Sequence, residues 1–309
     1  MKILITGANG MVGRNISKHP AITKNTLLTP SSKELDLTQF TEVEKYLETH
    51  SPEIIIHCAG KVGGIQANIS EPVDFLIKNL DIGRNIVLGA KQAGIKKLIN
   101  MSSSCMYPHD AKNPLKEEYI LRGELEQTNE GYALAKITTS KLCEYINRED
   151  SSFQYKTLIP CNLYGKYDKF SEKNSHMIPA VIKKTIEAIK HKNSVIEIWG
   201  DGKARREFMY AGDLASFVSN ALDNYNNLPS LMNVGLGYDY SISEYYQTIA
   251  DILGFKGEFV HDLSKPIGMK QKLIDTQKLS QYGWKSKTSL TEGLAKTIEY
   301  YNNMEHLHE

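Results

Sequence analysis

The sequence lacks most of the features that mark metal, membrane and nucleic-acid proteins. Its 309 residues include only four cysteines, and their spacing is not that of a metal site. No apolar run is long enough to span a bilayer, and a predicted strand begins within two residues of the amino terminus, so no secretory signal is visible. The net charge is +1, and no basic block interleaved with aromatic residues suggests nucleic acid as a partner. We therefore expect a cytoplasmic protein without a metal or a membrane segment.

What the sequence does contain is an alternation of strand and helix patterns. Hydrophobic residues make up 41% of the chain, enough for one large or two medium domains. The alternation predicts an α/β fold with a Rossmann-type doubly wound parallel sheet, and past Gly165 the pattern loosens into a smaller α/β substrate domain. The predicted strands are 2–6, 26–29, 53–58, 96–101 and 155–160, and the predicted helices are 38–49, 72–92, 131–149 and 176–191.

A glycine-rich segment follows the first predicted strand and precedes a helical pattern. Glycines at such a turn let the backbone approach a pyrophosphate, which then lies at the amino-terminal end of the helix. The spacing departs from the standard dinucleotide fingerprint, and a plain turn between strand and helix is the alternative. The context favours nucleotide binding, with these residues in the loop: Gly7, Asn9, Gly10, Met11, Val12 and Gly13.

Tyr132 and Lys136 are four residues apart in a predicted helix, which places a phenol and an ammonium on one face, about 6 Å apart along the axis. A neighbouring cation stabilises a phenolate, so we expect Lys136 to lower the pKa of Tyr132 toward neutrality. Such a tyrosine can protonate a carbonyl oxygen, and Ser103 and Ser104 could hydrogen-bond the same oxygen. The pair alone also occurs by chance on exposed helix faces, and the glycine-rich segment favours the catalytic interpretation.

These two motifs, in this order, resemble the extended short-chain dehydrogenase/reductase superfamily. Six further segments make the chain similar, nearly end to end, to the GDP-L-fucose synthase family of GDP-4-keto-6-deoxy-mannose epimerase/reductases: 59–65, 103–108, 114–118, 128–132, 174–179 and 206–208. The resemblance implies an NADP(H)-binding domain at 1–165 and 206–237 and a nucleotide-sugar-binding domain at 166–205 and 238–309. It also implies a homodimer formed through the helices near 72–92 and 131–149.

The end of the second predicted strand bears on the choice of cofactor. NAD enzymes often place an acid there against the ribose hydroxyls, whereas this chain has hydroxyls and a lysine that can bind a 2′-phosphate, which favours NADP(H). The serines could instead simply form a turn, and the arginine usual in the family is absent. The cofactor-binding residues expected outside the glycine-rich loop are Ser31, Ser32, Lys33, Asp36, Leu37, Ala59, Gly60, Tyr132 and Lys136.

The resemblance implies reduction of the C4 ketone of a GDP-linked 4-keto-6-deoxy sugar, hexose or heptose. Tyr132 would deliver the proton, Lys136 would bind the nicotinamide ribose, and Ser103 or Ser104 would orient the ketone. Members of the family also invert C3 and C5, and a thiol and an imidazole can exchange the protons involved near neutral pH. The matching residues are Cys105 and His176, which could otherwise be a packing residue and a helix cap.

The resemblance also implies a set of contacts with the nucleotide sugar: Asn162, His176, Lys184, Trp199, Arg206 and Lys272. Trp199 could instead belong to a hydrophobic core, and Arg206 could form a surface ion pair with Glu207. A bifunctional epimerase/reductase and a reductase without epimerisation both stay open. A GDP-sugar 4,6-dehydratase would carry an acid where Cys105 and Met106 stand, and a non-catalytic dinucleotide sensor would not need the tyrosine and lysine pair.

Overall fold

The computed structural model describes residues 1–170, 175–265 and 268–305. Its main element is a six-stranded sheet in which every neighbouring pair of strands is parallel. In spatial order the strands are β10 (Leu231–Val234), β5 (Gln154–Pro160), β4 (Lys97–Met101), β3 (Ile54–His57), β1 (Lys2–Thr6) and β2 (Thr26–Leu28). β5 and β10 are neighbours in the sheet although a long segment separates them in the sequence. The chain therefore leaves the sheet after β5 and returns to it with β10.

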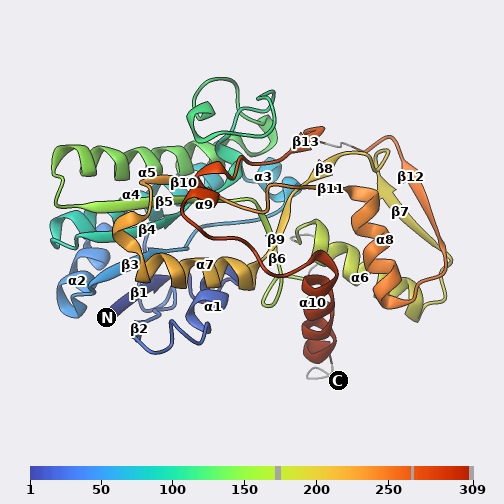
Figure 1. Cartoon of the computed structure of the whole chain (residues 1–309), viewed down its shortest axis with the longest axis horizontal. Coiled ribbons are helices and arrows are strands. Elements are labelled where there is room, and N and C mark those ends of the chain that lie inside the picture. Colours follow the sequence, from blue (N-terminus) through green and yellow to red (C-terminus); the bar gives the residue numbers. More distant parts are fainter. Residues whose placement is uncertain (171–174, 266–267, 306–309) are drawn as a thin grey trace.

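Helices cover both faces of this sheet (Figure 1). One face carries α2 (Phe40–His50), α4 (Pro72–Gln92) and α5 (Glu130–Glu149), and the other carries α1 (Met11–Ser17) and α7 (Ala211–Asp223). Strands buried on both faces need near-continuous apolar runs, and Ile54 to Ile56 in β3 are buried without exception. The predicted doubly wound parallel fold is confirmed, and the predicted elements lie within two residues of the observed ones.

A second unit packs around its own hydrophobic core, beside the carboxyl ends of the sheet strands (Figure 1). It contains two small sheets, one parallel and one mixed, and three longer helices. Its elements are α6 (Met177–Lys190), β7 (Val195–Trp199), β8 (Arg205–Arg206), β11 (Tyr240–Ser241), α8 (Ile242–Leu253), β12 (Glu258–Asp262), β13 (Gln271–Lys272) and α10 (Leu290–Glu305). The parallel pair β6 (Asn162–Tyr164) and β9 (Phe208–Tyr210) joins the two units.

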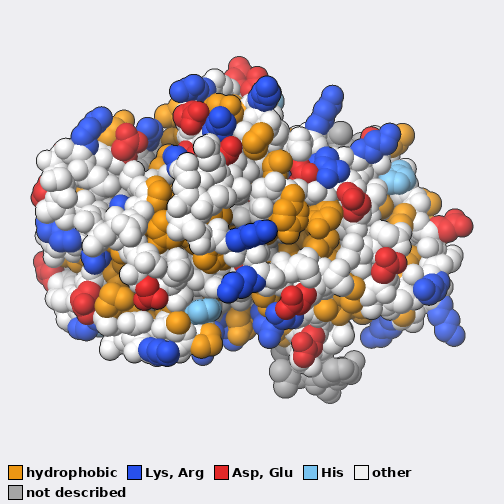
Figure 2. Space-filling view, viewed as in Figure 1, with side chains coloured by type: hydrophobic (Ala, Val, Ile, Leu, Met, Phe, Trp, Pro, Cys, Tyr) orange, Lys and Arg blue, Asp and Glu red, His pale blue; other side chains and the backbone are white. Residues whose placement is uncertain are grey.

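The remaining elements are short. They are α3 (Ile65–Ser70), α9 (Gln277–Gln281) and the 3-10 turns η1 (Ser104–Met106), η2 (Glu117–Tyr119), η3 (Gln127–Asn129) and η4 (Tyr225–Asn227). None of the helices in the described ranges is long and apolar enough to cross a membrane. Over the face drawn in Figure 2, acidic and basic side chains are interspersed, as a net charge of +1 leads one to expect.

Candidate active site

The glycine-rich segment forms a tight turn between β1 and α1. Gly7 has a φ of +70°, and its carbonyl accepts a hydrogen bond of 3.0 Å from the amide of Gly10. Gly13 lies against this turn so closely that a Cβ atom there would be 2.3 Å from the carbonyl oxygen of Gly7. Asn9 and Gly10 are exposed, and helix α1 begins at Met11, with Val12 in its first turn. The backbone can therefore approach a pyrophosphate closely, as the sequence predicts.

The end of β2 presents exposed polar side chains beside this turn. Ser32 and Lys33 are exposed, and the amide of Ser31 donates a hydrogen bond of 2.7 Å to Glu34. That bond lowers the pKa of Glu34, so its carboxylate is charged at neutral pH. A 2′-phosphate placed here would meet the lysine and the hydroxyls but also this charge. The residues at the carboxyl end of β2 can thus accommodate NADP(H), but they do not strongly favour it over NAD(H).

Asp36 and Leu37, expected to flank the adenine, are held firmly. The Asp36 carboxylate accepts hydrogen bonds from the Thr38 amide at 2.9 Å and the Thr38 hydroxyl at 2.8 Å. Leu37 is buried in the core beneath the sheet, and its carbonyl accepts a 3.0 Å hydrogen bond from Asn85. Because its carboxylate is hydrogen-bonded to Thr38, Asp36 contributes a fixed side chain to this part of the site and not a carboxylate without partners.

Tyr132 and Lys136 lie on one face of α5, as predicted. The Lys136 ammonium is buried, donates a 3.1 Å hydrogen bond to the carbonyl of Met101 at the end of β4, and lies 5.7 Å from the centroid of the Tyr132 ring. Burial raises the pKa of Tyr132, and Cys105 adds to the rise. The expected lowering of that pKa is therefore wrong for this structure, because the burial of the phenol dominates. A phenol that stays protonated at neutral pH can still act as the acid, because it can donate its proton to the carbonyl oxygen while the ketone is reduced.

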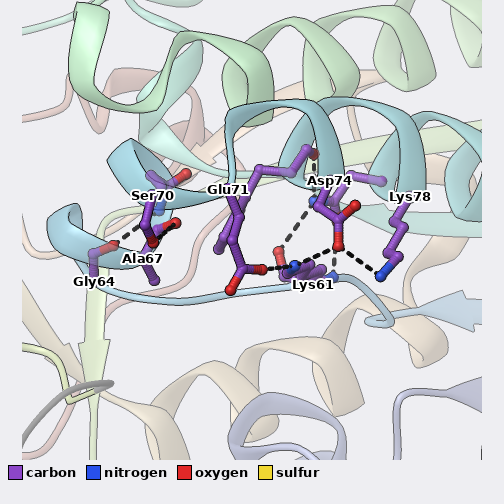
Figure 3. Close-up of polar contacts among 10 residues, drawn as sticks. Lys61, Gly64, Ala67, Ser70, Glu71, Asp74 and Lys78 are labelled. Carbon is purple, nitrogen blue, oxygen red and sulfur yellow. Dashed lines mark hydrogen bonds and ion pairs between the residues drawn. The ribbon is translucent and has the colours of Figure 1, made fainter.

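The loop after β3 packs against this pair and is anchored by residues that the sequence reasoning missed. Lys61 forms ion pairs with Glu71 and Asp74, the second at 2.9 Å (Figure 3). Asn79 accepts a 2.8 Å hydrogen bond from the Lys61 amide and donates one of 3.0 Å to the Lys61 carbonyl. A Cβ atom at Gly60 would lie 3.8 Å from the Lys136 ammonium, so the anchored loop passes directly beside the site.

Part of this loop was indicated by the sequence, since 59–65 is one of the segments that carry the resemblance. Ala59 follows β3 and packs against the core that includes Leu37. Phe75, one turn before Asn79 on α4, meets the Tyr132 ring edge-on, with centroids 6.5 Å apart. Asn79 carried no signal of its own in a single sequence, because an asparagine in a helix is usually read as a surface residue.

Ser103, Ser104 and Cys105 follow β4 and face the same region. Ser103 caps η1 by accepting a bond of 3.4 Å from the Cys105 amide, and Ser104 and Cys105 are buried. Burial raises the pKa of Cys105, while the charges of Lys272 and Lys136 and a hydrogen bond with Ser103 act to lower it. The thiol is thus close enough to Lys272 and Lys136 for the charges of both to act on it.

Arg206 and Lys272 are register partners in the parallel strands β8 and β13. Burial lowers the pKa of both side chains, and the positive charge of Arg206 lowers that of Lys272 further. Asn162 donates a 3.1 Å hydrogen bond to the carbonyl of Glu207, beside Arg206. Two cations concentrated in one partly buried place suit a diphosphate. The alternative of a surface ion pair between Arg206 and Glu207 is not what forms, because the Glu207 side chain is buried and bonded to backbone amides.

His176 is the N-cap residue of α6, as the cap alternative predicts, and its carbonyl accepts a 3.1 Å hydrogen bond from the Ala180 amide, but among the described residues its side chain makes no capping hydrogen bond. Its Nδ1 atom lies 3.9 Å from the carboxylate of Asp168, which is buried, while the imidazole is about half exposed. Asn174 lies outside the described residues. No hydrogen bond or ion pair in the described ranges joins His176 to Tyr132 or Cys105, so the two candidate proton carriers are not in direct contact.

Trp199 and Lys184 lie in the second unit around Glu197. Trp199 is 49% exposed, so it is not a core residue, and its indole donates a 3.1 Å hydrogen bond to the Glu197 carboxylate. Lys265 lies 5.7 Å from the centroid of the Trp199 ring. Lys184 donates a 2.7 Å hydrogen bond to the Glu197 carbonyl. An exposed indole next to a lysine is suited to stack on a planar, electron-rich ligand.

The fold and these residues define a dinucleotide-binding protein with a tyrosine and lysine pair beside the cofactor turn. Residues 3–235 match the NAD dependent epimerase/dehydratase family, and the chain belongs to that family. It is 60% identical to a GDP-L-colitose synthase of Yersinia pseudotuberculosis over 98% of each chain. It is 47% identical to a GDP-L-fucose synthase of Azorhizobium caulinodans over 97% of this chain and 96% of the other.

A solved structure is similar along almost the whole chain. The GDP-mannoheptose C4 reductase of Campylobacter jejuni, with NADP bound, superposes with a TM-score of 0.87 and 33% identity, covering 97% of this chain and 98% of the other. The expected family relationship and the extended fold are therefore confirmed.

Proposed function

We propose that this chain is an NADPH-dependent reductase of the C4 ketone of a GDP-linked 4-keto-6-deoxy sugar. The observation that carries the proposal is the convergence of Tyr132, Lys136, Cys105 and Lys272 in one region, which the loop at Ala59 and Gly60 connects to the glycine-rich turn. Relatives named as synthases or reductases of GDP-linked sugars cover 97–98% of the chain. Because identity is 60% to a GDP-L-colitose synthase and 33% to a heptose reductase, we infer a sugar closer to that of the first relative.

The groups of the chain have separable tasks in this reaction. The bound nicotinamide cofactor supplies a hydride. Tyr132 holds its proton at neutral pH because burial raises its pKa, and it gives that proton to the C4 oxygen. Ser103 or Ser104 orients the ketone, while Lys136, whose pKa is lowered by burial, lies beside the ring of Tyr132 and would bind the ribose. Removing water from this place strengthens each of these interactions.

Inversion at the carbons beside the ketone would need one group to remove a proton and another to return it. Burial raises the pKa of the Cys105 thiol, the charges of Lys272 and Lys136 act against this rise, and His176 is accessible and lies 3.9 Å from the Asp168 carboxylate. These properties support Cys105 and His176 as the two proton carriers. Arg206, Lys272, Asn162, Trp199 and Lys184 would hold the nucleotide sugar.

The cofactor proposal rests on the glycine-rich turn and on the end of β2. Lys33 is exposed there, and the solved relative from Campylobacter jejuni holds NADP. We assign residues 1–165 and 206–237 to cofactor binding, and 166–205 and 238–309 to nucleotide-sugar binding. A comparison of kcat/KM for NADPH and NADH in the wild type and in Lys33→Met tests the preference, which should fall by about tenfold in the variant.

We propose a homodimer through α4 and α5. Val73 and Ile77, one turn apart on α4, and Leu134 on α5 are exposed apolar side chains on two helices that pack against each other, and a partner chain would cover them. A cytoplasmic location agrees with four free cysteines, three of them buried, since such thiols persist in a reducing compartment.

The proposed function is tested by incubating the protein with NADPH and GDP-4-keto sugars of both chain lengths in heavy water. Product identity and deuterium at C3 and C5 are followed by NMR. We expect NADPH oxidation coupled to a GDP-6-deoxy sugar, with deuterium uptake that is lost in Cys105→Ser or His176→Asn. Reduction without uptake would reject epimerisation, and NADP(H) binding with no turnover on any keto sugar would favour the sensor alternative. Formation of a keto product from a GDP-hexose would instead indicate a dehydratase.

A further inference from the structure

Glu207 is a buried carboxylate that none of the proposed chemical steps uses. Its side chain is 0% exposed, and both of its oxygens accept backbone hydrogen bonds. Oε1 accepts from the amides of Leu236 and Gly237, the second at 3.0 Å, and Oε2 accepts from the amide of Ile274 at 3.0 Å. Within the described ranges no lysine, arginine or histidine forms an ion pair with it. Burial raises the pKa of the Glu207 carboxyl to about 7, while the hydrogen bonds from the three backbone amides act to lower it, so these amides are what stabilise its charged form.

The segments that meet at Glu207 come from distant parts of the sequence. Leu236 and Gly237 follow β10, the last strand of the large sheet, and Ile274 follows β13 of the second unit. Gly235 permits the approach, since a Cβ atom there would lie 2.4 Å from Oε1. One side chain thus joins the central sheet to the strand that carries Lys272.

The backbone at Glu207 and its neighbour Arg206 also contacts residues of the proposed nucleotide-sugar site. Arg206 directly precedes Glu207 and pairs in register with Lys272. The Glu207 carbonyl accepts the hydrogen bond from Asn162, and the Arg206 carbonyl accepts one of 2.9 Å from Tyr245. Three residues proposed to bind the nucleotide sugar are therefore placed by contacts within one residue of Glu207.

We propose that Glu207 is a positioning residue of the nucleotide-sugar site: its carboxylate fixes the backbone at Ile274 and thereby holds Lys272 beside Arg206, facing the diphosphate. This inference rests on the proposed function, because it takes the diphosphate as the ligand of the two cations. Glu207 itself touches neither substrate nor cofactor in this scheme.

Two of the three amides bond to Oε1 and one bonds to Oε2, so a single substitution can remove the second contact and keep the first two. In Glu207→Gln the amide oxygen can keep the two amides of Leu236 and Gly237, but the new NH2 group then faces the amide of Ile274, donor against donor. The variant should therefore release the segment that carries Lys272 and leave the end of β10 attached. Glu207→Asp keeps both acceptors on a shorter stem and serves as a second variant if the first fails to fold.

Asp213 offers a matched control in another part of the fold. It is also a buried carboxylate, and it accepts hydrogen bonds from the amides of Lys287 and Thr288 at 3.1 Å and 2.9 Å. Asp213→Asn makes the same chemical change, and the segment that Asp213 anchors carries none of the proposed site residues. A loss of stability that both variants show can then be distinguished from a loss of GDP affinity that only Glu207→Gln shows.

The experiment measures the affinities of GDP and NADPH by calorimetry, and kcat and KM for the keto sugar, in the wild type, Glu207→Gln, Lys272→Met, their double variant and Asp213→Asn. We expect Glu207→Gln to raise the Kd of GDP and the KM by about tenfold, with the Kd of NADPH and kcat changed by less than about threefold. The double variant should bind GDP no more than about threefold more weakly than Lys272→Met alone, because both changes remove the same contact. Asp213→Asn should leave GDP affinity unchanged.

Independent, multiplying effects of Glu207→Gln and Lys272→Met on GDP affinity would overturn the inference. An unchanged Kd for GDP in Glu207→Gln or Glu207→Asp, with only a lowered melting temperature, would overturn it as well. The failure of the proposed function looks different, since a wild-type protein that binds NADPH but no GDP would reject the nucleotide-sugar site itself and this role with it.

Discussion

Two glycines of the same turn should respond very differently to one added methyl group. A Cβ atom at Gly13 would lie 2.3 Å from the carbonyl oxygen and 2.7 Å from the carbonyl carbon of Gly7, both of them backbone atoms. At Gly10 it would lie 3.4 Å from the same oxygen, an ordinary contact, and its φ of −82° suits any residue. Gly13→Ala must therefore move α1 away from the turn by about 1 Å, whereas Gly10→Ala needs no movement.

The magnitude follows from the cost of overpacking. A methyl group forced against backbone costs about 1–3 kcal/mol, and a shift of α1 also removes its amides from the pyrophosphate. We expect Gly13→Ala to lower the melting temperature by several degrees and to weaken NADPH binding by at least about tenfold. Gly10→Ala should keep the melting temperature of the wild type.

The assay combines differential scanning fluorimetry with calorimetric titration of NADPH for the two variants and the wild type. A change in NADPH affinity without a change in stability in Gly10→Ala would locate the pyrophosphate directly above that residue. If Gly13→Ala melted and bound NADPH like the wild type, the close approach of α1 to the turn would be wrong, and with it the placement of the cofactor.

Three further outcomes are expected. Tyr132→Phe should slow reduction by about two to four orders of magnitude and leave NADPH affinity nearly unchanged, measured by single-turnover oxidation of NADPH; retained turnover would exclude this phenol as the proton donor. His57 is buried and bonded to Thr6, and burial, with the nearby charge of Lys136, lowers its pKa to about 3. Because this folded-state pKa lies below the unfolded value of about 6.5, stability falls as pH falls, by about 2 kcal/mol between pH 6.5 and 4.5. Urea unfolding of His57→Gln should show a smaller loss over that range, and an equal loss would contradict the assignment. Val73→Glu should convert a dimer into monomers in light-scattering measurements, and a wild type that is monomeric at micromolar concentration would reject the interface.

The local features of this protein were readable from the sequence. Apolar runs such as 54–56 predicted buried strands, the glycine spacing predicted the turn after β1, and the four-residue interval predicted that Tyr132 and Lys136 share a face of α5. Each of these depends on residues within a few positions of one another, where the periods of helix and strand and the freedom of glycine decide the conformation.

Burial and long-range pairing were decided only by the tertiary structure. Resemblance to a family named Cys105 and Lys272, but only the folded chain brings the thiol within reach of the charges of Lys272 and Lys136. The same holds for the pKa of Tyr132, which rises because the fold buries the phenol and brings it near Cys105. Glu207, for which the sequence left a surface ion pair with Arg206 as an alternative, is a buried anchor because three backbone amides from separate segments meet there. A linear pattern states which groups are present, whereas desolvation and the partners of each charge arise only when distant segments pack together.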